Sequence, residues 1–433
     1  MPNIHLYSDN KPYACCYHRS ILNHPEIIKA LRYWENERIS QPFPCTRPHR
    51  YVTFDIDQGG LNNIRLVLEY VVVIAALTGR TLVLPPGQPW YLINFGPMAA
   101  GKPGGYTELA DIFDISALRE VIPVLTTPEF IAEASQHLAI PEDFQHERFI
   151  DANQQANSPL IENWKKWLLH NSEVIPWNPY NTLICQPDIK SVTDNVELAE
   201  DYIDGRQFVE FSPAMSSSPV IHFPSNEEYR SLGPVATMLA AKDLNLPVAC
   251  RRLLKNHLRY RPEIFAKASE IINLLGHNKY DAIHIRRNDF QYQQTRLNAE
   301  AILANIEPLL DSGLPVYIAT DEIEDEFFAE ISHKHRVARW TELVNRANGN
   351  IDIPFSWIGP IEQIICAGAR RFIGTDLSTF SAYMNRIRGY AEAHDTQCYY
   401  HSIDYNDAES VAQSRQFRGR EYLRENPLFW TEC

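Results

Sequence analysis

The chain has 433 residues, 45% of them hydrophobic and 22% charged, and its formal net charge is −14 at pH 7. This composition is typical of a globular protein with a large core, and it argues against widespread disorder. The negative charge argues against nonspecific binding of nucleic acid, so we expect no nucleic-acid partner. The length predicts two domains, or three.

Three absences in the sequence bear on the compartment. No stretch reaches 18 uninterrupted apolar residues, and the longest run, Val71 to Leu77, is typical of a soluble helix. The first 20 residues contain no hydrophobic signal region. The eight cysteines form no C-x-x-C pair, and no N-x-[ST] glycosylation site occurs. We therefore expect a cytoplasmic protein without a membrane span, or a secretory-pathway protein if a leader has been removed.

Residues 1–50 are predicted to form an N-terminal extension, with a helix over 25–37 followed by loop. No chemistry is assigned to this segment.

The next stretch predicts a βαβ unit. A strand over 51–56 is followed by the turn Gly59-Gly60, a helix over 63–78 that Gly79 ends, and a strand over 81–84. The glycines let the backbone approach a ligand closely. The helix start beyond them offers free N–H groups and the positive end of the helix dipole, which together suit an anion.

Asp55 and Asp57 form an Asp-x-Asp pair just before this turn. In some sugar transferases such a pair holds a divalent cation on the nucleotide diphosphate. We favour the other reading, without a metal, because the glycine turn already offers anion-binding geometry and no other acidic cluster lies nearby.

Residues 87–230 are rich in aromatic residues, proline and loops. We predict helices over 111–121 and 163–170, and a strand over 220–224 that returns to the first sheet. Aromatic and asparagine side chains in such loops suit recognition of a polar acceptor, and they suit ordinary loop packing equally well. A domain boundary is predicted between Pro224 and Pro234, with a helix over 234–244 after it.

Strands and helices alternate regularly in the second half, which predicts a mostly parallel sheet covered on both faces. The predicted elements are two helices broken around Pro262, strands over 280–287, 315–321, 336–340 and 371–375, and helices over 298–310, 324–333, 360–369 and 378–390. The final 40 residues are not assigned.

The stretch YDAIHIRRNDF (280–290) carries the strongest functional signal. On a strand of period two, His284 and Arg286 share one face and Arg287 takes the other. Ligands of open α/β sheets bind at the carboxyl ends of strands, and arginine matches phosphate oxygens with two parallel donors. We predict a phosphate or pyrophosphate site with Arg286 as the main contact. The alternative is that the arginines pair with local carboxylates such as Asp289.

Two further strand ends should meet the first at one sheet edge. Asp321 ends the strand over 315–321, and Ser378 and Thr379 follow the strand over 371–375. Ser378 is a natural N-cap, and its hydroxyl and the neighbouring N–H groups can bind a phosphate at the helix start. Ser378 alone is as well explained by a plain cap without a ligand.

Four stretches together resemble the GDP-fucose-dependent fucosyltransferases of the protein O-fucosyltransferase and α1,6-fucosyltransferase superfamily. They are GGLNNIR (59–65) with TGRTLVLPP (78–86), HIRRND (284–289), YIATDE (317–322) and EQIICAGARRFIGTDLSTFS (362–381). The resemblance covers the central two thirds of the chain, and it rests on the order and spacing of these motifs.

The resemblance implies an α/β fold of the GT-B type, with two Rossmann-like domains facing across a cleft. We expect an acceptor-side domain over 51–230 and a nucleotide-sugar-binding domain over 231–433. The resemblance also implies an inverting transfer of fucose from GDP-fucose to a protein hydroxyl or a glycan, without a metal or other cofactor.

The resemblance assigns roles residue by residue. Arg286 is expected to hold the β-phosphate and stabilise the leaving group, and His284 and Glu362 to contact guanine or its ribose. Glu362 stands where the family usually has aspartate. The complete set of expected donor-binding residues is Gly59, Gly60, Asn62, Asn63, His284, Arg286, Arg287, Asp321, Glu362, Thr375, Asp376, Ser378, Thr379 and Phe380.

The catalytic base is where the sequence departs from the family. Some members carry a glutamate where this chain has Gly59, and core-fucosylating members carry one where this chain has Gln294. Asp289, our expected catalytic residue beside Arg286, and Asp57 are the candidates, and a dissociative mechanism without a strong base is a third route. Two alternatives stay open: another donor, such as a rhamnose nucleotide, and a binding protein that has lost catalysis.

Overall fold

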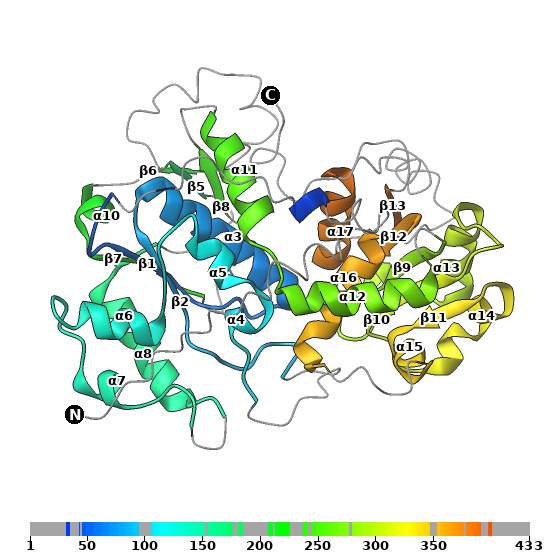
Figure 1. Cartoon of the computed structure of the whole chain (residues 1–433), viewed down its shortest axis with the longest axis horizontal. Helices are drawn as coiled ribbons and strands as arrows, with labels where there is room; N and C mark the ends of the chain where they lie inside the picture. Colours follow the sequence, from blue (N-terminus) through cyan, green and yellow to red (C-terminus); the bar gives the residue numbers. More distant parts are fainter. Residues whose placement is uncertain are drawn as a thin grey trace.

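The computed structural model describes residues 32–34, 43, 46–94, 105–151, 155–175, 181–184, 207–210, 213–225, 237–240, 245–276, 279–346, 353–375, 378–390 and 397–400. Figure 1 shows two larger sheets side by side, the first in the left part of the molecule and the second in the right part.

The first sheet is parallel and has the order β3-β2-β1-β7-β4. Its strands are β1 (Tyr51–Phe54), β2 (Thr81–Leu84), β3 (Val124–Thr126), β4 (Glu173–Val174) and β7 (Val220–Phe223). The predicted strands at 81–84 and 220–224 are confirmed, as is the one at 51–56, which ends two residues early. Thus β7 returns beside β1, as expected, with Tyr51 opposite Val220.

The second sheet is also parallel, in the order β11-β10-β9-β12-β13. Its strands are β9 (Asp281–Ile285), β10 (Val316–Thr320), β11 (Val337–Arg339), β12 (Arg371–Thr375) and β13 (Gln397–Tyr400). The chain runs outward from β9 to β11 and then resumes on the other side of β9 with β12. The carboxyl ends of β9 and β12 therefore form a switch point, where ligands of such sheets bind.

A third, smaller parallel sheet has the order β6-β5-β8. It consists of β5 (Asn181–Ile184), β6 (Gln207–Glu210) and β8 (Thr237–Ala240). The helix predicted over 234–244 is wrong, because Thr237–Ala240 pairs along its whole length with Asn181–Ile184. Long-range pairing has overridden the helix preference of its alanine, leucine and methionine.

The helices of the first half are α3 (Leu61–Thr78), α4 (Leu109–Ile112), α5 (Ile115–Arg119), α6 (Thr127–Ala134), α7 (Glu142–His146), α8 (Ser158–Asn171) and α10 (Pro213–Ser217). The single helix predicted over 111–121 is two short helices, because Asp114 starts α5 by accepting a hydrogen bond from the Ala117 N–H at 3.1 Å. The helix predicted over 25–37 lies outside the described residues except for η1 (Arg32–Trp34), a 3-10 helix.

The helices of the second half follow the prediction more closely. They are α11 (Asn245–His257), α12 (Pro262–Leu275), α13 (Ala299–Ile306), α14 (Ala329–Lys334), α15 (Trp340–Arg346), α16 (Ile358–Ala367) and α17 (Thr379–Tyr390). Short 3-10 helices are η4 (Gln293–Thr295), η5 (Glu307–Leu309), η6 (Asp325–Phe328) and η7 (Phe355–Trp357). Pro262 stands at the first position of α12, where a missing N–H does no harm.

Helix α3 is the central element of the first half. All but three of its residues are buried, and Gly79 ends it in the left-handed conformation, with φ 61°. A Cβ added to Gly79 would lie 2.0 Å from Thr46 Oγ1, so only glycine fits there.

Among the described residues, α3 is the one helix long and apolar enough to cross a membrane, and 83% of that 18-residue window is buried inside the protein. A buried core helix passes the same test, so this finding carries no assignment to a membrane.

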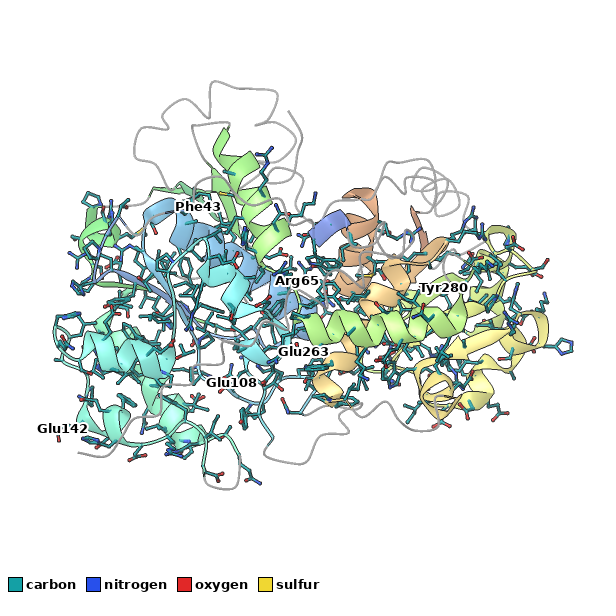
Figure 2. All side chains as sticks on the ribbon, viewed as in Figure 1. Phe43, Arg65, Glu108, Glu142, Glu263 and Tyr280 are labelled. Carbon is teal, nitrogen blue, oxygen red and sulfur yellow. The ribbon has the colours of Figure 1, made fainter. Side chains whose placement is uncertain are left out.

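The largest hydrophobic cluster joins the two halves. It contains α3 residues such as Val67 and Val71 together with Ile361 and Ile364 of α16. Figure 2 labels Tyr280, which belongs to this cluster, and Phe43, which packs against it from the other side of the molecule. Because the cluster is continuous, it holds the edges of the two larger sheets at fixed positions relative to one another.

Candidate active site

A cavity of about 1510 Å³ is lined by residues from both halves of the chain. The first half contributes Gln58–Asn63, Leu66 and Tyr91–Ile93; the second contributes residues that follow β9, β10 and β11 and residues of α16 and α17. Pockets for single small ligands measure roughly 300–1,000 Å³, so this cavity has room for more than one bound molecule.

The start of α3 forms one wall of the cavity. Gly60 stands at the N-cap with φ −71° and ψ 175°, and it has no side chain to cap the first N–H groups. That conformation is open to any residue, so glycine is not required there for its backbone. A Cβ at this position would contact Leu92 Cδ1 at 3.4 Å. The glycine therefore keeps the positive end of the helix open to the cavity.

Arg286 follows β9 and carries the main positive charge near this wall. Its Nη2 lies 2.9 Å from Asp289 Oδ1, its Nη1 pairs with Asp321 Oδ2, and its N–H donates to Thr375 Oγ1 at 2.9 Å. Burial and the charge of Arg296 lower the pKa of Arg286 to about 10, so it stays positively charged at neutral pH. The carboxylate pairing that we considered for Asp289 is thus present in the site without a ligand.

His284 is held in a fixed orientation beside Arg286. Its Nδ1 lies 2.9 Å from Ser381 Oγ, and the ring of Phe380 stacks on it with centroids 4.2 Å apart. Burial, aided by the charge of Arg286, lowers the pKa of His284 to about 3. His284 is therefore neutral at physiological pH and can contact a ligand only as a neutral donor or acceptor.

The start of α17 touches the start of α3. Thr379 Oγ1 donates to Asn63 Oδ1 at 3.0 Å, and Gln363 Nε2 of α16 donates to Asn62 Oδ1 at 2.7 Å. Ser378, directly before α17, is buried and lines the same cavity. Two helix starts that are far apart in sequence thus lie together at one edge of the cavity.

Glu362 of α16 lines the cavity beside Tyr317 of β10. The Tyr317 hydroxyl donates to Glu362 Oε1 at 2.9 Å. Burial raises the pKa of Glu362 to about 8, although the hydrogen bond from Tyr317 works in the opposite direction. Glu362 is therefore mostly protonated at neutral pH when no ligand is bound.

Most predicted site residues meet at this cavity. Those that line it are Gly59, Gly60, Asn62, Asn63, His284, Arg286, Asp289, Asp321, Glu362, Ser378, Thr379 and Phe380. Asp376 lies outside the described residues.

Two predicted residues are placed behind the cavity wall. Thr375 is buried and donates to the His284 carbonyl at 2.8 Å, which ties the ends of β9 and β12 together. Arg287 points elsewhere: its Nε lies 2.9 Å from Glu322 Oε2, and its guanidinium stacks 3.9 Å above the Phe327 ring.

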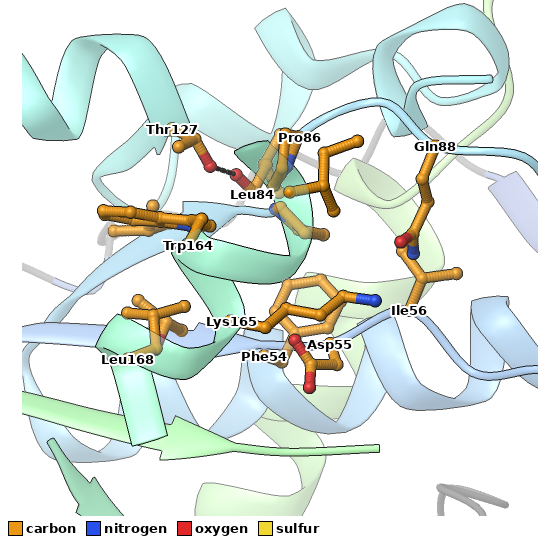
Figure 3. Close-up of a pocket in the computed structure, with 14 residues that line it drawn as sticks. Phe54, Asp55, Ile56, Leu84, Pro86, Gln88, Thr127, Trp164, Lys165 and Leu168 are labelled. Atoms are coloured by element: carbon orange, nitrogen blue, oxygen red, sulfur yellow. Dashed lines mark hydrogen bonds between the residues drawn. The ribbon is translucent and has the colours of Figure 1, made fainter. Parts of the chain in front are cut away.

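Asp55 and Asp57 are engaged in local contacts. Asp57 Oδ1 accepts from the Gly59 N–H at 2.6 Å, and Asp55 Oδ2 accepts from the Ser225 N–H at 3.1 Å. Asp55 faces a separate, smaller pocket bordered by Trp164 and Lys165 (Figure 3). Across the part of the chain that the structure describes, no group of three or more His, Cys, Asp or Glu side chains could hold a metal ion.

Some cavity residues were not anticipated. Tyr91, Leu92, Trp340 and Phe355 line it, and Leu92 has a positive φ of 66°. Tyr91 and Leu92 belong to the aromatic loop for which we had left acceptor recognition and loop packing equally open. Trp340 opens α15, a helix that no pattern in the sequence had indicated to us.

The model of the GDP-fucose protein O-fucosyltransferase family matches residues 51–391 of this chain. The chain belongs to the GDP-fucose protein O-fucosyltransferase family. The matched span contains every cavity residue discussed above and confirms the resemblance seen in the four motifs.

The curated relatives match only a short part of the chain. The chain is 32% identical over 117 residues to GDP-fucose protein O-fucosyltransferase 2 of Homo sapiens and of Pan troglodytes. The aligned segment covers 25% of this chain and spans only 26% of each of these curated relatives.

Among solved structures, the chain is similar to POFUT1 in complex with GDP, with a TM-score of 0.42 and 16% identity over 80% of this chain and 97% of that one. It is also similar to NodZ α-1,6-fucosyltransferase soaked with GDP-fucose, with a TM-score of 0.40 and 14% identity over 78% and 92% of the two chains.

Proposed function

We propose that this member of the family is an inverting fucosyltransferase that transfers fucose from GDP-fucose to a protein hydroxyl or a glycan without a metal. The observation that carries the proposal is the meeting of Arg286 with two helix starts, those of α3 and α17, at one large cavity. A cationic fork and two positive helix ends suit a pyrophosphate.

In this mechanism the donor pyrophosphate lies between Arg286, the Gly59-Gly60 turn and the Ser378-Thr379 turn. Glycosyl transfer builds negative charge on the departing β-phosphate. Fixed donors that already point at that phosphate stabilise the charge without reorganising. Arg286 and the N–H groups at the two helix starts supply these donors, which is the basis on which we propose metal independence.

Asp289 is our candidate for the base. Asp289 and Asp321 both pair with Arg286. A bound β-phosphate competes for the same guanidinium, so donor binding frees Asp289 to accept the proton of the acceptor hydroxyl. The base is then competent only when the donor is in place, so proton removal from the acceptor depends on donor binding.

Guanine is assigned to the part of the cavity that Glu362 lines, where Tyr317 donates a hydrogen bond to Glu362. His284, neutral and held by Ser381 and Phe380, is placed to contact the donor beside Arg286. Arg287 and Thr375 then support the site from behind rather than by touching the donor.

We further propose the GT-B arrangement for the fold, with a domain over 51–230 facing one over 231–433 across the cavity. The acceptor side is the wall formed by the first domain, where Tyr91 and Leu92 lie. For the compartment we propose the cytoplasm, or the secretory pathway if a leader has been removed.

The test is calorimetric titration of GDP, UDP and ADP into the purified chain without metal, followed by transfer assays with GDP-fucose in EDTA. We expect GDP to bind more tightly than the other two nucleotides, and transfer to persist in EDTA. A preference for UDP points to another donor sugar, and binding of none of the three refutes the proposed site. Transfer lost in EDTA and restored by manganese refutes metal independence and returns Asp55 and Asp57 to consideration.

A further inference from the structure

A buried ionic network connects α3 with α17. Glu69 of α3 accepts from Arg65 Nη1 at 2.6 Å, from Arg386 Nη1 at 3.0 Å and from Arg386 Nη2 at 2.5 Å. Arg386 is fully buried, and Arg65 and Glu69 are exposed by only 1% and 5%. Figure 2 labels Arg65 in the middle of the molecule, where α3 approaches the second half.

The free energy of desolvation makes this network a poor source of stability on its own. Removing charges from water costs several kcal/mol per ion, and apolar residues of similar volume are often as stabilising as a buried ion pair. Both arginines lie against Tyr383 of α17, whose ring is 3.5 Å from Arg65 Cζ and 4.8 Å from Arg386 Cζ. Burial acts to raise the pKa of Glu69, but the charges of Arg386 and Arg65 outweigh it and hold the pKa below the usual value.

What the network does fix is the register of the two helices. At the cavity, Thr379 of α17 bonds to Asn63 of α3. Six residues further along α3 and seven along α17, Arg386 bonds to Glu69. These steps span roughly 9 Å and 10.5 Å at 1.5 Å per residue, so the helices run in the same direction and are joined at two levels. A slip of one turn, about 5.4 Å, would break both contacts.

The parallel arrangement brings two positive helix ends together at the cavity. Each end is equivalent to roughly half a positive charge, so the two repel one another when no anion is bound. Glu69 and Arg386 lie two turns away, outside the cavity lining, whereas Arg65 lies closer and donates from Nε to Asn62 Oδ1 at 3.5 Å. The network can therefore hold the two ends at a fixed spacing before a donor arrives.

We propose that Glu69 and Arg386 are positioning residues for the donor: by locking α17 to α3 in one register, they set the spacing of the two helix starts that bind the pyrophosphate. This inference rests on the proposed function. It adds that the donor site is preorganised by a contact between the two halves of the chain, and that donor affinity depends on residues that do not touch the donor.

The test replaces the network without leaving an unpaired charge. The variant Arg65→Met/Glu69→Leu/Arg386→Met keeps similar volumes, and we expect it to fold with a thermal midpoint close to that of the wild type. GDP binding should weaken about tenfold, within the range that such positional coupling produces. The KM for the donor should rise while transfer at saturating donor falls less.

A control variant removes a partly buried ion pair that lies within the second half alone. Arg370 Nη2 pairs with Asp281 Oδ2 at 2.6 Å; Asp281 is buried, the Arg370 side chain is 32% exposed, and neither residue contacts Glu69. We expect Asp281→Asn/Arg370→Met to change stability but to leave GDP affinity unaltered. If both combinations weaken GDP binding alike, the effect is a general loss of stability and the inference is wrong.

A coupling measurement separates positioning from structural support. Thr379→Val should weaken GDP binding in the wild type and have much less effect in the triple variant, because the register that places Thr379 is already lost. If two sites this far apart act independently, the factors by which their substitutions raise the dissociation constant for GDP multiply in the combined variant. Multiplying effects would therefore overturn the inference.

A second variant tests the positioning role independently, in case the triple variant does not fold. Arg386→Lys keeps the charge and loses the two-pronged contact with Glu69, so we expect a lower thermal midpoint and, at a temperature where the variant stays folded, a smaller but measurable loss of GDP affinity. Unaltered GDP affinity in every folded variant refutes the positioning role. A wild-type chain that binds no GDP refutes the proposed function itself, which is a different result.

Discussion

The raised pKa of Glu362 makes a sharp prediction about pH. If Glu362 reads guanine, it must accept hydrogen bonds from the base, and only the ionised carboxylate is purely an acceptor. With a pKa of about 8 in the free protein, the ionised fraction rises about tenfold between pH 7 and pH 9. We therefore expect GDP to bind about tenfold more tightly at pH 9 than at pH 7.

The assay is calorimetry in two buffers with different heats of ionisation, which reports the protons released on binding. At pH 7 we expect release of nearly one proton per GDP, and little release at pH 9. Glu362→Gln is the control: its GDP affinity should be weaker at high pH and flat across the range. A wild-type affinity that does not change with pH, with no proton released, would falsify the role of Glu362 as a reader of guanine.

The same group affects the stability of the free protein in the opposite sense. A carboxyl whose pKa is raised on folding favours the folded state below its unfolded pKa, and this contribution is lost as pH rises through the folded value of about 8. The free energy of unfolding should therefore fall with rising pH, by at most about 1.4 kcal/mol per pH unit, and by less because Glu362 faces the cavity. In Glu362→Gln this slope should shrink, which urea unfolding at several pH values will measure.

Three further predictions concern single positions. Arg286→Ala should lower kcat about 10²- to 10³-fold while the protein stays folded, and retention of full transfer would contradict the role of the arginine at the leaving phosphate. Gly60→Ala should fold normally but raise the donor KM several-fold, because the added methyl lies at the cavity wall against Leu92; an unchanged KM would show that the donor keeps away from this wall. Gly79→Ala should destabilise the protein by about 1–3 kcal/mol in urea unfolding, because φ is 61° and the methyl meets Thr46, with donor affinity per folded molecule unaltered.

Local signals in the sequence predicted much of the fold. The strands at 81–84 and 371–375 were predicted with their full bounds; the first is a short, mostly apolar run that two prolines end, and the second has an apolar pair, Phe372-Ile373, at its centre. The start of α12 was predictable because proline fits only the first turn of a helix. By contrast, β8 depends on pairing with β5, some fifty residues earlier, and no local pattern carries that information.

The candidate site, too, was predictable from the sequence only in part. The rule that parallel strands end at one edge was enough to bring His284, Arg286, Asp321 and Ser378 together. It could not show that Arg287 turns away to Glu322, since strand period alone does not specify the partner. Two charged residues inside an otherwise apolar helix, Arg65 and Glu69, were a visible signal of a buried network, but the partner on α17 could not be read from the sequence.

The distance along the chain between Glu69 and Arg386 has a consequence for folding during synthesis on the ribosome. The two residues are 317 positions apart in the chain. As synthesis proceeds from the N-terminus, α3 emerges long before α11, which packs against it, and α17, which supplies the second arginine to its carboxylate. An apolar, incompletely covered helix is then exposed for most of translation, at about 5–20 residues per second. The buried contacts that α3 makes with α17 can therefore form only when nearly the whole chain has been made.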